Sequence, residues 1–304
     1  MKNDIKLHLA PLAGYSDVGF RTAAFLAGAD STCTEMLSAQ AMKHDSAKTA
    51  LMAITHPLEK CVSAQIFGHD PQVMAWAAAH EMLQKFDTID INMGCPAHKV
   101  VRNGEGSALL KNLPLAGKII SECKSAIGDR KLTVKVRTGF DVPNVAEIIR
   151  TCQEAGADAI CLHGRTTIQQ YSGKSDLEAI ALAKAVSKVP LIGNGDVKDK
   201  SSLEEMLSTG VDGVMIGRGA VGSPWIFSSL KDKKIDKFTL IQQHVDILRK
   251  YYDEKWLTLH LRKHFLAYAA SFSAPASDKR KLALMSNIDE GIKILKNLFN
   301  HFEN

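Results

Sequence analysis

The segment that decides the fold is IDINMGCP, residues 89–96, which continues as AHKVVRNGEGS to residue 107. Apolar and polar residues alternate up to Met93, and this alternation predicts a short strand that ends at Gly94. A loop with a cysteine, a proline and several basic residues follows. Because α/β proteins place their chemistry where strands end and loops begin, Cys95 is a candidate proton donor or nucleophile. An isolated cysteine is more commonly a small buried residue, so this interpretation depends on the residues around it.

The same unit of strand, polar loop and amphipathic helix recurs from residue 7 to about residue 219. Strands are expected at 7–13, 31–37, 61–67, 88–94, 132–138, 159–163, 190–195 and 213–217. Helices are expected at 17–26, 38–54, 71–86, 114–127, 144–155, 177–186 and 201–207. Eight strands that alternate with helices favour a (β/α)8 TIM barrel over an open doubly wound sheet.

The strand pattern ceases after Trp225, and helical patterns follow at 238–252, 256–271 and 278–302. The last of these carries an apolar stripe for packing on sister helices, made of Ile288, Ile292, Leu295, Phe299 and Phe302. We therefore expect two domains, a catalytic barrel at residues 1–227 and a small all-α helical bundle at residues 228–304.

The formal net charge is +5, and the excess lies at one end of the chain. Residues 228–304 hold 14 Lys and Arg against 9 Asp and Glu, while the preceding residues are balanced. A solvated helical surface explains such an excess as well as a polyanion-binding face does. No run of eighteen apolar residues and no apolar signal core occur, so we expect no membrane segment and a cytoplasmic location. The six cysteines form no CxxC pair, which argues against a zinc site and a disulfide scaffold, and no metal is expected.

Seven of the expected strands end in polar residues that would meet at one rim of a barrel. Gln65, Asn92, Lys135 and His163 are among them. Singly, Gln65 reads as a strand cap, His163 as a buried core histidine and Lys135 as half of an ion pair. Together they favour a functional rim over a packing role.

The loops after the last two strands are rich in glycine. Gly193-Asn194-Gly195 and Gly217-Arg218-Gly219 place backbone N–H groups where the phosphate site of this fold usually lies. Residues 217–222 also spell GxGxxG, but no βαβ unit follows, so we interpret the loops as a cradle for a mononucleotide phosphate. With Lys135 directed at the barrel centre, this cradle suggests FMN, whose reduced ring the lysine would stabilise.

Further motifs accompany these residues along nearly the whole chain. They are PLAG at 11–14 with Asp17, Gln65, NMGCP at 92–96, KVRTG at 135–139, HGRT at 163–166, Gln169 with Tyr171, NGD at 194–196, Gly217-Arg218, and Arg262-Lys263-His264 with Tyr268. This combination resembles the tRNA-dihydrouridine synthase family.

The resemblance implies an FMN- and NAD(P)H-dependent enzyme that reduces specific uridines in tRNA to 5,6-dihydrouridine. Hydride would pass from reduced FMN to C6, and Cys95 would donate a proton to C5, with NADPH as a transient reductant. The thiol must then keep its proton, as an ordinary pKa near 8.5 allows. The implied FMN contacts are Pro11, Leu12, Ala13, Gln65, Lys135, His163, Asn194, Gly195, Asp196, Gly217 and Arg218.

A target base within folded RNA must be swung out of its stack, which requires a second surface that grips phosphates. The expected substrate or tRNA contacts are Asn92, Lys99, Arg102, Arg137, Arg165, Tyr171, Arg262, Lys263 and Arg280, with Lys279 and Lys281 as further candidates. We expect tRNA and not DNA as the partner, and a monomer. Glu105, Thr167 and Leu177 depart from the family pattern.

Two alternatives remain. A barrel that acts on a free pyrimidine, in the manner of dihydroorotate dehydrogenases, shares the phosphate cradle but has no need of a basic helical domain. A non-catalytic RNA-binding protein with a relic barrel would lack bound flavin. The sequence leaves open which tRNA position is reduced, the oligomeric state, and NADPH against NADH.

Overall fold

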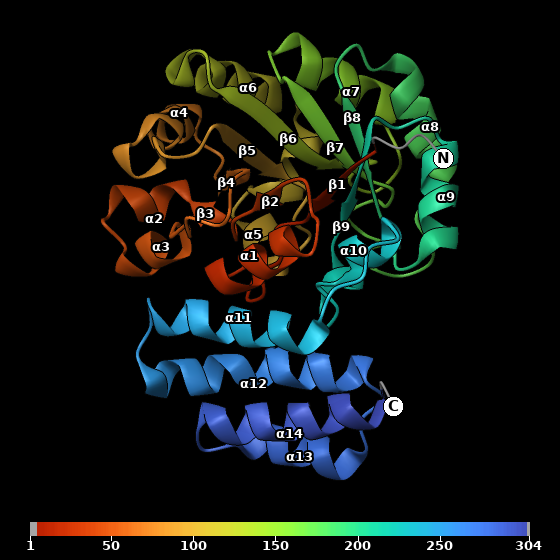
Figure 1. Ribbon diagram of the computed structural model, residues 1–304. Helices are drawn as coiled ribbons and strands as arrows, with labels where there is room; N and C mark the ends of the chain where they lie inside the picture. Colours follow the sequence, from red (N-terminus) through yellow and green to blue (C-terminus); the bar gives the residue numbers. More distant parts are fainter. Residues whose placement is uncertain (1–4, 303–304) are drawn as a thin grey trace.

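The computed structural model describes residues 5–302, in which parallel strands form a nearly closed barrel surrounded by helices (Figure 1). The strands are β1 Lys6–Leu9, β2 Thr32–Cys33, β3 Leu37–Ser38, β4 Val62–Phe67, β5 Thr88–Met93, β6 Lys131–Arg137, β7 Ala159–His163, β8 Leu191–Asn194 and β9 Gly213–Ile216. They pair in the order β1-β9-β8-β7-β6-β5-β4-β2, and β3 also pairs with β4. The predicted TIM barrel is therefore confirmed.

The barrel closes between β1 and β2 through a parallel bridge of His8 with Ser31. There the Leu9 N–H donates to the Ser31 carbonyl at 2.9 Å. The strand expected at 31–37 is two short pieces, β2 and β3, which pair with opposite ends of β4. The first strand ends earlier than expected, at Leu9. The Ala10 N–H still donates to the Ile216 carbonyl, but Pro11 has no N–H for the ladder.

The barrel helices match the expected positions with four differences, one of which is a helix at Ile226–Leu230 that was not expected. The helices are α1 Val18–Leu26, α2 Ala39–Lys43, α3 Ala47–Met52, α4 Pro71–Ala79, α5 His98–Arg102, α6 Leu113–Ile127, α7 Val145–Glu154, α8 Leu177–Val186, α9 Lys200–Ser208 and α10 Ile226–Leu230. Segment 38–54 forms two helices, separated where Asp45 adopts φ +50°. Segment 71–86 ends its α-helix at Ala79, because His80 is extended and its ring accepts the Met82 N–H. The loop after β5 contains α5 and a 3₁₀ helix at Gly106–Lys111 that were not expected.

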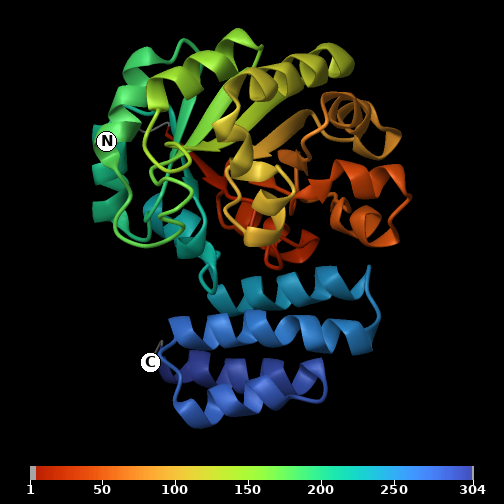
Figure 2. The same ribbon diagram turned by 180° about the vertical axis from the view of Figure 1, so that it is seen from behind.

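Below the barrel lies an all-α unit made of α11 Lys237–Arg249, α12 Glu254–Ser271, α13 Ala276–Leu284 and α14 Ile288–Phe302 (Figures 1 and 2). The prediction of a single helix at 278–302 is wrong, because two helices, α13 and α14, occupy this segment. Met285 is extended, and the Asn287 side chain accepts the Glu290 N–H to begin α14. In the stripe, Ile288 and Leu295 are buried and Ile292 and Phe299 pack beside them, whereas the Phe302 side chain lies outside the described residues.

The two units meet where α1 packs on α11. Val18 and Ala23 of α1, and Ala27 directly after it, belong to the apolar cluster of the helical unit. Gly19 permits this contact, because a Cβ there would come within 2.6 Å of His244 on α11. Phe227 and Leu230 still pack in the barrel core, and Phe238 packs in the helical cluster. No helix in the described part of the chain is long and apolar enough to cross a membrane.

Candidate active site

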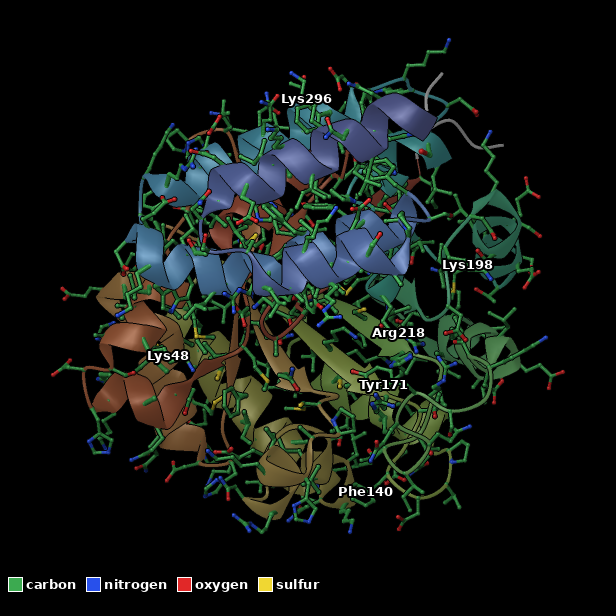
Figure 3. All side chains as sticks on the ribbon, turned by 90° about the horizontal axis from the view of Figure 1, so that it is seen from below. Lys48, Phe140, Tyr171, Lys198, Arg218 and Lys296 are labelled. Atoms are coloured by element: carbon green, nitrogen blue, oxygen red, sulfur yellow. The ribbon has the colours of Figure 1, made fainter. Side chains whose placement is uncertain are left out.

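A cleft of about 1420 Å3 lies at the carboxyl ends of the barrel strands. Every residue predicted to contact FMN lines it, and so do Cys95, Asn92, Arg137 and Tyr171. Tyr171 and Arg218 stand together at its edge (Figure 3), with the guanidinium carbon 4.8 Å from the ring centroid. Strands far apart in the sequence therefore bring one set of polar groups to one space, because parallel strands end on the same side of a barrel.

Cys95 is held by hydrogen bonds on both sides of its peptide. Its N–H donates to Asn92 Oδ1 at 2.9 Å, and its carbonyl accepts from the N–H and the hydroxyl of Ser107 at 3.1 and 2.8 Å. The preceding carbonyl, of Gly94, accepts from Arg137 Nε at 2.7 Å. Gly106, with φ +58°, packs so closely that a Cβ there would lie 3.2 Å from the Cβ of Cys95. These contacts hold the backbone that carries the thiol.

The protonation of Cys95 follows from its surroundings. Burial raises the pKa of the Cys95 thiol above its ordinary value. The Ala97 N–H and the charges of Arg137 and Lys135 act in the opposite direction but with smaller effect. At neutral pH the group is a thiol, the form required of a proton donor.

A hydrogen-bonded chain connects the cleft wall to the cysteine loop. Gln65 Nε2 donates to Asp90 Oδ2 at 2.6 Å, and Asn92 Nδ2 donates to Gln65 Oε1 at 2.8 Å. Asn92 then accepts the Cys95 N–H with its oxygen. The amide of Asn92, a residue expected to contact the substrate, therefore orients the cysteine loop.

Lys135 reaches the cleft from β6 and donates to Asn194 Oδ1 at 2.9 Å. Asn194 is oriented in turn, because its Nδ2 donates to the Met215 carbonyl at 2.7 Å. The lysine is thus held by an amide oxygen, which leaves its positive charge available to a ligand with negative charge.

His163, at the end of β7, is neutral. Burial, followed by the charge of Lys135, lowers its pKa to about 2. Its Nε2 lies 3.3 Å from Arg165 Nη1, which only donates, so Nε2 accepts and the ring proton is on Nδ1. The cleft therefore gains a neutral N–H donor.

The expected RNA contact at Arg165 is not supported, because its guanidinium is buried. Arg165 pairs with Asp196 at 2.6 Å and donates to the carbonyls of Ser172 and Gly173. Asp196 also accepts from Arg218 at 2.8 Å. Arg165 thus holds the loop after β7 against the loop after β8.

The glycines of the two loops allow these loops to pack closely against neighbouring backbone and side chains at the cleft. Gly195 has φ +137°, and a Cβ there would lie 2.3 Å from Ser175 Oγ. A Cβ at Gly219 would lie 2.3 Å from the Val197 carbonyl oxygen. Ser175 Oγ is buried, belongs to a residue that lines the cleft and has no hydrogen-bond partner within residues 5–302. A hydroxyl donor of this kind in the cleft wall fits a phosphate oxygen, and Ser175 was missed because no motif in the sequence marks it.

The other predicted RNA contacts fall into two groups. Arg102 and Arg280 are exposed, and Lys99 and Lys263 line a second cavity of about 1510 Å3 between the barrel and α12. The others have structural partners: Arg137 is buried and donates to the carbonyls of Thr166 and Gln170, and Arg262 donates to the Met285 carbonyl.

The three departures from the family pattern have structural roles. Glu105 is buried 3.7 Å from His69 Nδ1, and burial raises its pKa. The Thr167 N–H donates to the Gly139 carbonyl at 3.0 Å, and Leu177 begins α8.

Comparisons with known proteins agree with the motifs. Residues 8–303 match the family model described as Dihydrouridine synthase (Dus). A probable tRNA-dihydrouridine synthase of Helicobacter pylori is 34% identical, with 98% of this chain and 93% of that protein covered. A probable tRNA-dihydrouridine synthase of Aquifex aeolicus is 39% identical, with 74% and 72% covered. The tRNA-dihydrouridine synthase B of Proteus vulgaris is 33% identical, with 96% and 95% covered.

A likeness to a solved structure concerns the fold alone. The amine oxidase HisD from Pseudomonas geniculata N1, which acts on 6-hydroxypseudooxynicotine, superposes with a TM-score of 0.56 at 13% identity. The match covers 74% of this chain and 47% of that longer chain. The barrel, the motifs at its rim and the match over nearly the whole length lead to one conclusion: the chain belongs to the tRNA-dihydrouridine synthase family.

Proposed function

We propose that this protein reduces specific uridines in tRNA to 5,6-dihydrouridine in the cleft at the carboxyl ends of its barrel strands. One observation carries the proposal: Cys95 shares that cleft with Lys135 and with the glycine loops. Its thiol keeps its proton because burial raises the pKa. Family membership supports the reaction class.

FMN is the proposed cofactor, and the residues present fit it. Gly195, Gly217, Arg218 and the unpartnered hydroxyl of Ser175 would hold the phosphate. Lys135, which donates to the amide oxygen of Asn194 and has no carboxylate partner in the part of the chain that the structure describes, would meet the negative charge of the reduced ring. When bound, reduced FMN supplies the hydride for C6 of uridine, with NADPH as the proposed transient reductant.

Cys95 supplies the proton in this proposal. C5 of the uracil must gain a proton as C6 gains hydride, and the thiol is placed and protonated to give it. Asn92, Ser107 and Arg137 are positioning residues, because they hold the peptide units around the sulfur.

tRNA is the proposed partner, bound across the barrel mouth and the helical unit. The target base must leave its stack to enter the cleft. Lys99, Arg102, Lys263 and Arg280, which come from both units, are the basic groups proposed to grip phosphates.

The test is to incubate the purified protein with FMN, NADPH and unmodified tRNA transcript and to measure dihydrouridine by mass spectrometry. We expect dihydrouridine in tRNA and no reduction of free uracil or orotate. Reduction of a free pyrimidine with tRNA left unchanged would overturn the proposal in favour of a dihydroorotate-dehydrogenase-like activity. A protein that binds tRNA but retains no flavin would indicate an RNA-binding role.

A further inference from the structure

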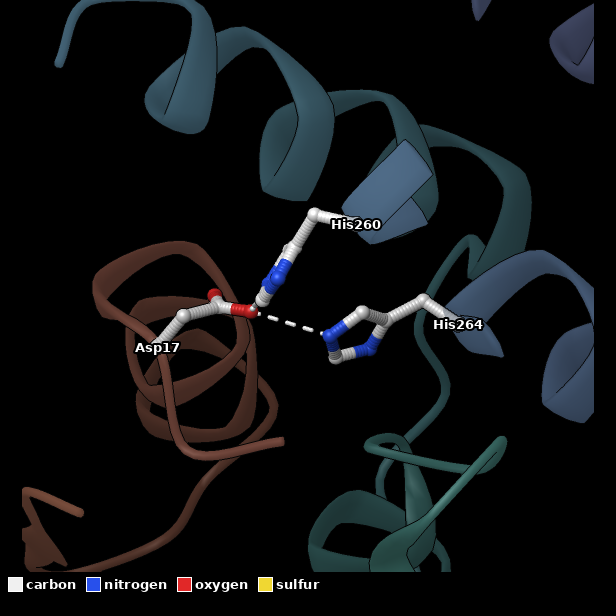
Figure 4. Close-up of side chains that lie close together, drawn as sticks. All are labelled: Asp17, His260 and His264. Atoms are coloured by element: carbon white, nitrogen blue, oxygen red, sulfur yellow. Dashed lines mark hydrogen bonds and ion pairs between the residues drawn. The ribbon is translucent and has the colours of Figure 1, made fainter. Parts of the chain in front are cut away.

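Away from the cleft, a carboxylate and two histidines meet at the contact between the barrel and the helical unit (Figure 4). Asp17 caps the start of α1, and His260 and His264 project from α12. Asp17 Oδ2 lies 2.9 Å from Nε2 of each histidine. One ligand atom from each residue lies within 4.8 Å of the others.

The spacing of the two histidines is that of a helical metal-binding pair. Residues four apart on an α-helix lie on the same face, and two histidines so placed can bind one zinc ion. Asp17 adds a carboxylate oxygen opposite them. Two imidazoles and a carboxylate form the ligand set of an open zinc site, in which the fourth position is free for water.

The side chains are held in this arrangement by their neighbours. The His260 ring stacks on Trp256, with centroids 4.4 Å apart and planes at 18°. The His264 ring packs edge-on against Tyr15, with centroids 5.2 Å apart. The other oxygen of Asp17 accepts the Phe20 N–H at 2.8 Å and lies 3.3 Å from His244 Nε2. Only Oδ2 of Asp17 therefore faces His260 and His264. Hydrogen bonds to the other oxygen orient the carboxylate, as contacts behind a metal ligand commonly do.

A second observation points to a missing ligand. His264 is 1% exposed, and its Nε2 approaches Asp17 Oδ2 to 2.9 Å as an ion pair. Among the described residues this nitrogen has no partner with the alignment of a hydrogen bond. A buried ring nitrogen that faces a carboxylate oxygen without such a bond is unusual, because buried polar atoms are nearly always satisfied. A cation bound to both atoms, with a small increase in their separation, would satisfy both.

We propose that Asp17, His260 and His264 bind one divalent metal ion of the zinc class. The ion is accessible, because Asp17 and His260 both line the second cavity, where the open position would carry water. Binding requires one local change. Lys263 Nζ, 3.3 Å from His260 Nδ1, must turn away as that nitrogen takes the ring proton. Glu35 lines the same cavity as Lys263 and offers it a carboxylate.

The proposed ion would join two units that are distant in the sequence. Asp17 belongs to the first loop of the barrel, and the histidines lie more than 240 residues later. Cysteine spacing, on which the expectation of no metal rested, carries no information on such a histidine and carboxylate site. The ion would therefore stabilise the docking of the helical unit on the barrel.

The test is calorimetric titration of Zn2+ into the full-length protein after chelator treatment and dialysis. We expect one Zn2+ per chain. His260→Ala and Asp17→Asn should each weaken binding at least about 10- to 100-fold, the cost of losing even an outer partner of a metal ligand. Asparagine keeps the N-cap of α1 but is a poorer ligand. His44→Ala and Cys61→Ser, which alter an exposed histidine and an exposed cysteine, are the controls and should bind as the unaltered protein does.

A thermal readout separates this site from adventitious zinc. Zn2+ should raise the melting temperature of the unaltered protein in a concentration-dependent way and leave that of His260→Ala unchanged. Absence of binding to the unaltered protein would overturn the proposal. So would equal affinity in His260→Ala, or a loss of binding in Cys61→Ser. None of these readouts depends on tRNA, FMN or activity.

Discussion

At the scale of single residues, Cys95 serves as an acid only while its sulfur keeps a proton. Because burial raises its pKa, the thiolate forms only above the ordinary thiol range. In a Cys61→Ser background, which removes the exposed cysteine, alkylation of Cys95 by iodoacetamide should be slow at pH 7 and accelerate only at pH above about 9. Mass spectrometry of the peptide that contains residue 95 gives the rate. Fast alkylation at pH 6 would show a thiolate and exclude the proposed role.

Lys135 is the residue whose charge the proposed cofactor needs most. Lys135→Met keeps the length of the side chain and removes its charge, so flavin retention and the rate of flavin reduction by NADPH should both fall. Lys131→Met is a matched control, because Lys131 begins the same strand but is exposed. Flavin absorbance of the purified variants is the measurement. Equal flavin content and equal reduction rates in both variants would argue against a role for Lys135.

At the scale of elements, the loop from β5 to the 3₁₀ helix positions the sulfur. Gly106 and Gly104 both have positive φ, so alanine at either strains the backbone by roughly 1 kcal/mol. Only position 106 touches Cys95, whereas a Cβ at 104 meets nothing within 4 Å. Gly106→Ala should therefore reduce dihydrouridine formation far more than Gly104→Ala at equal flavin content. Similar rates for the two variants would mean that the contact with Cys95 has no part in activity.

Sequence reasoning succeeded where a local period defines an element. Alternation places Gln65, Asn92 and Lys135 at strand ends, and the structure brings them to one cleft. It failed at breaks that depend on a single residue, such as Met285 between α13 and α14. It also missed the group of Asp17 with His264, because contacts between distant parts of a chain leave no periodic signal. Arg137 and Arg165 were assigned to RNA from their charge, but burial gives both of them backbone partners.

At the scale of the whole molecule, the basic excess of the helical unit predicts salt-dependent binding. If about four phosphates are neutralised, tRNA affinity should fall roughly 50- to 150-fold between 50 and 200 mM salt. Arg280 lies on α13, and Arg280→Gln should lower the slope of log affinity against log salt concentration by about one. Lys296→Gln should leave this slope unchanged, because Lys296 lies at the edge of the helical unit away from Tyr171 and Arg218 (Figure 3). Filter binding over a salt series gives the slopes, and an affinity independent of salt would contradict this prediction.

The central claim is that the thiol of Cys95 protonates C5 of a uridine in the cleft. The direct measurement is a single turnover, in which pre-reduced enzyme is mixed with unmodified tRNA and dihydrouridine is followed with time. We predict that Cys95→Ala retains flavin, is reduced by NADPH at the unaltered rate and binds tRNA normally. Its rate of dihydrouridine formation should fall about 100- to 10,000-fold, the usual contribution of a general acid. An unchanged rate in Cys95→Ala would contradict the account.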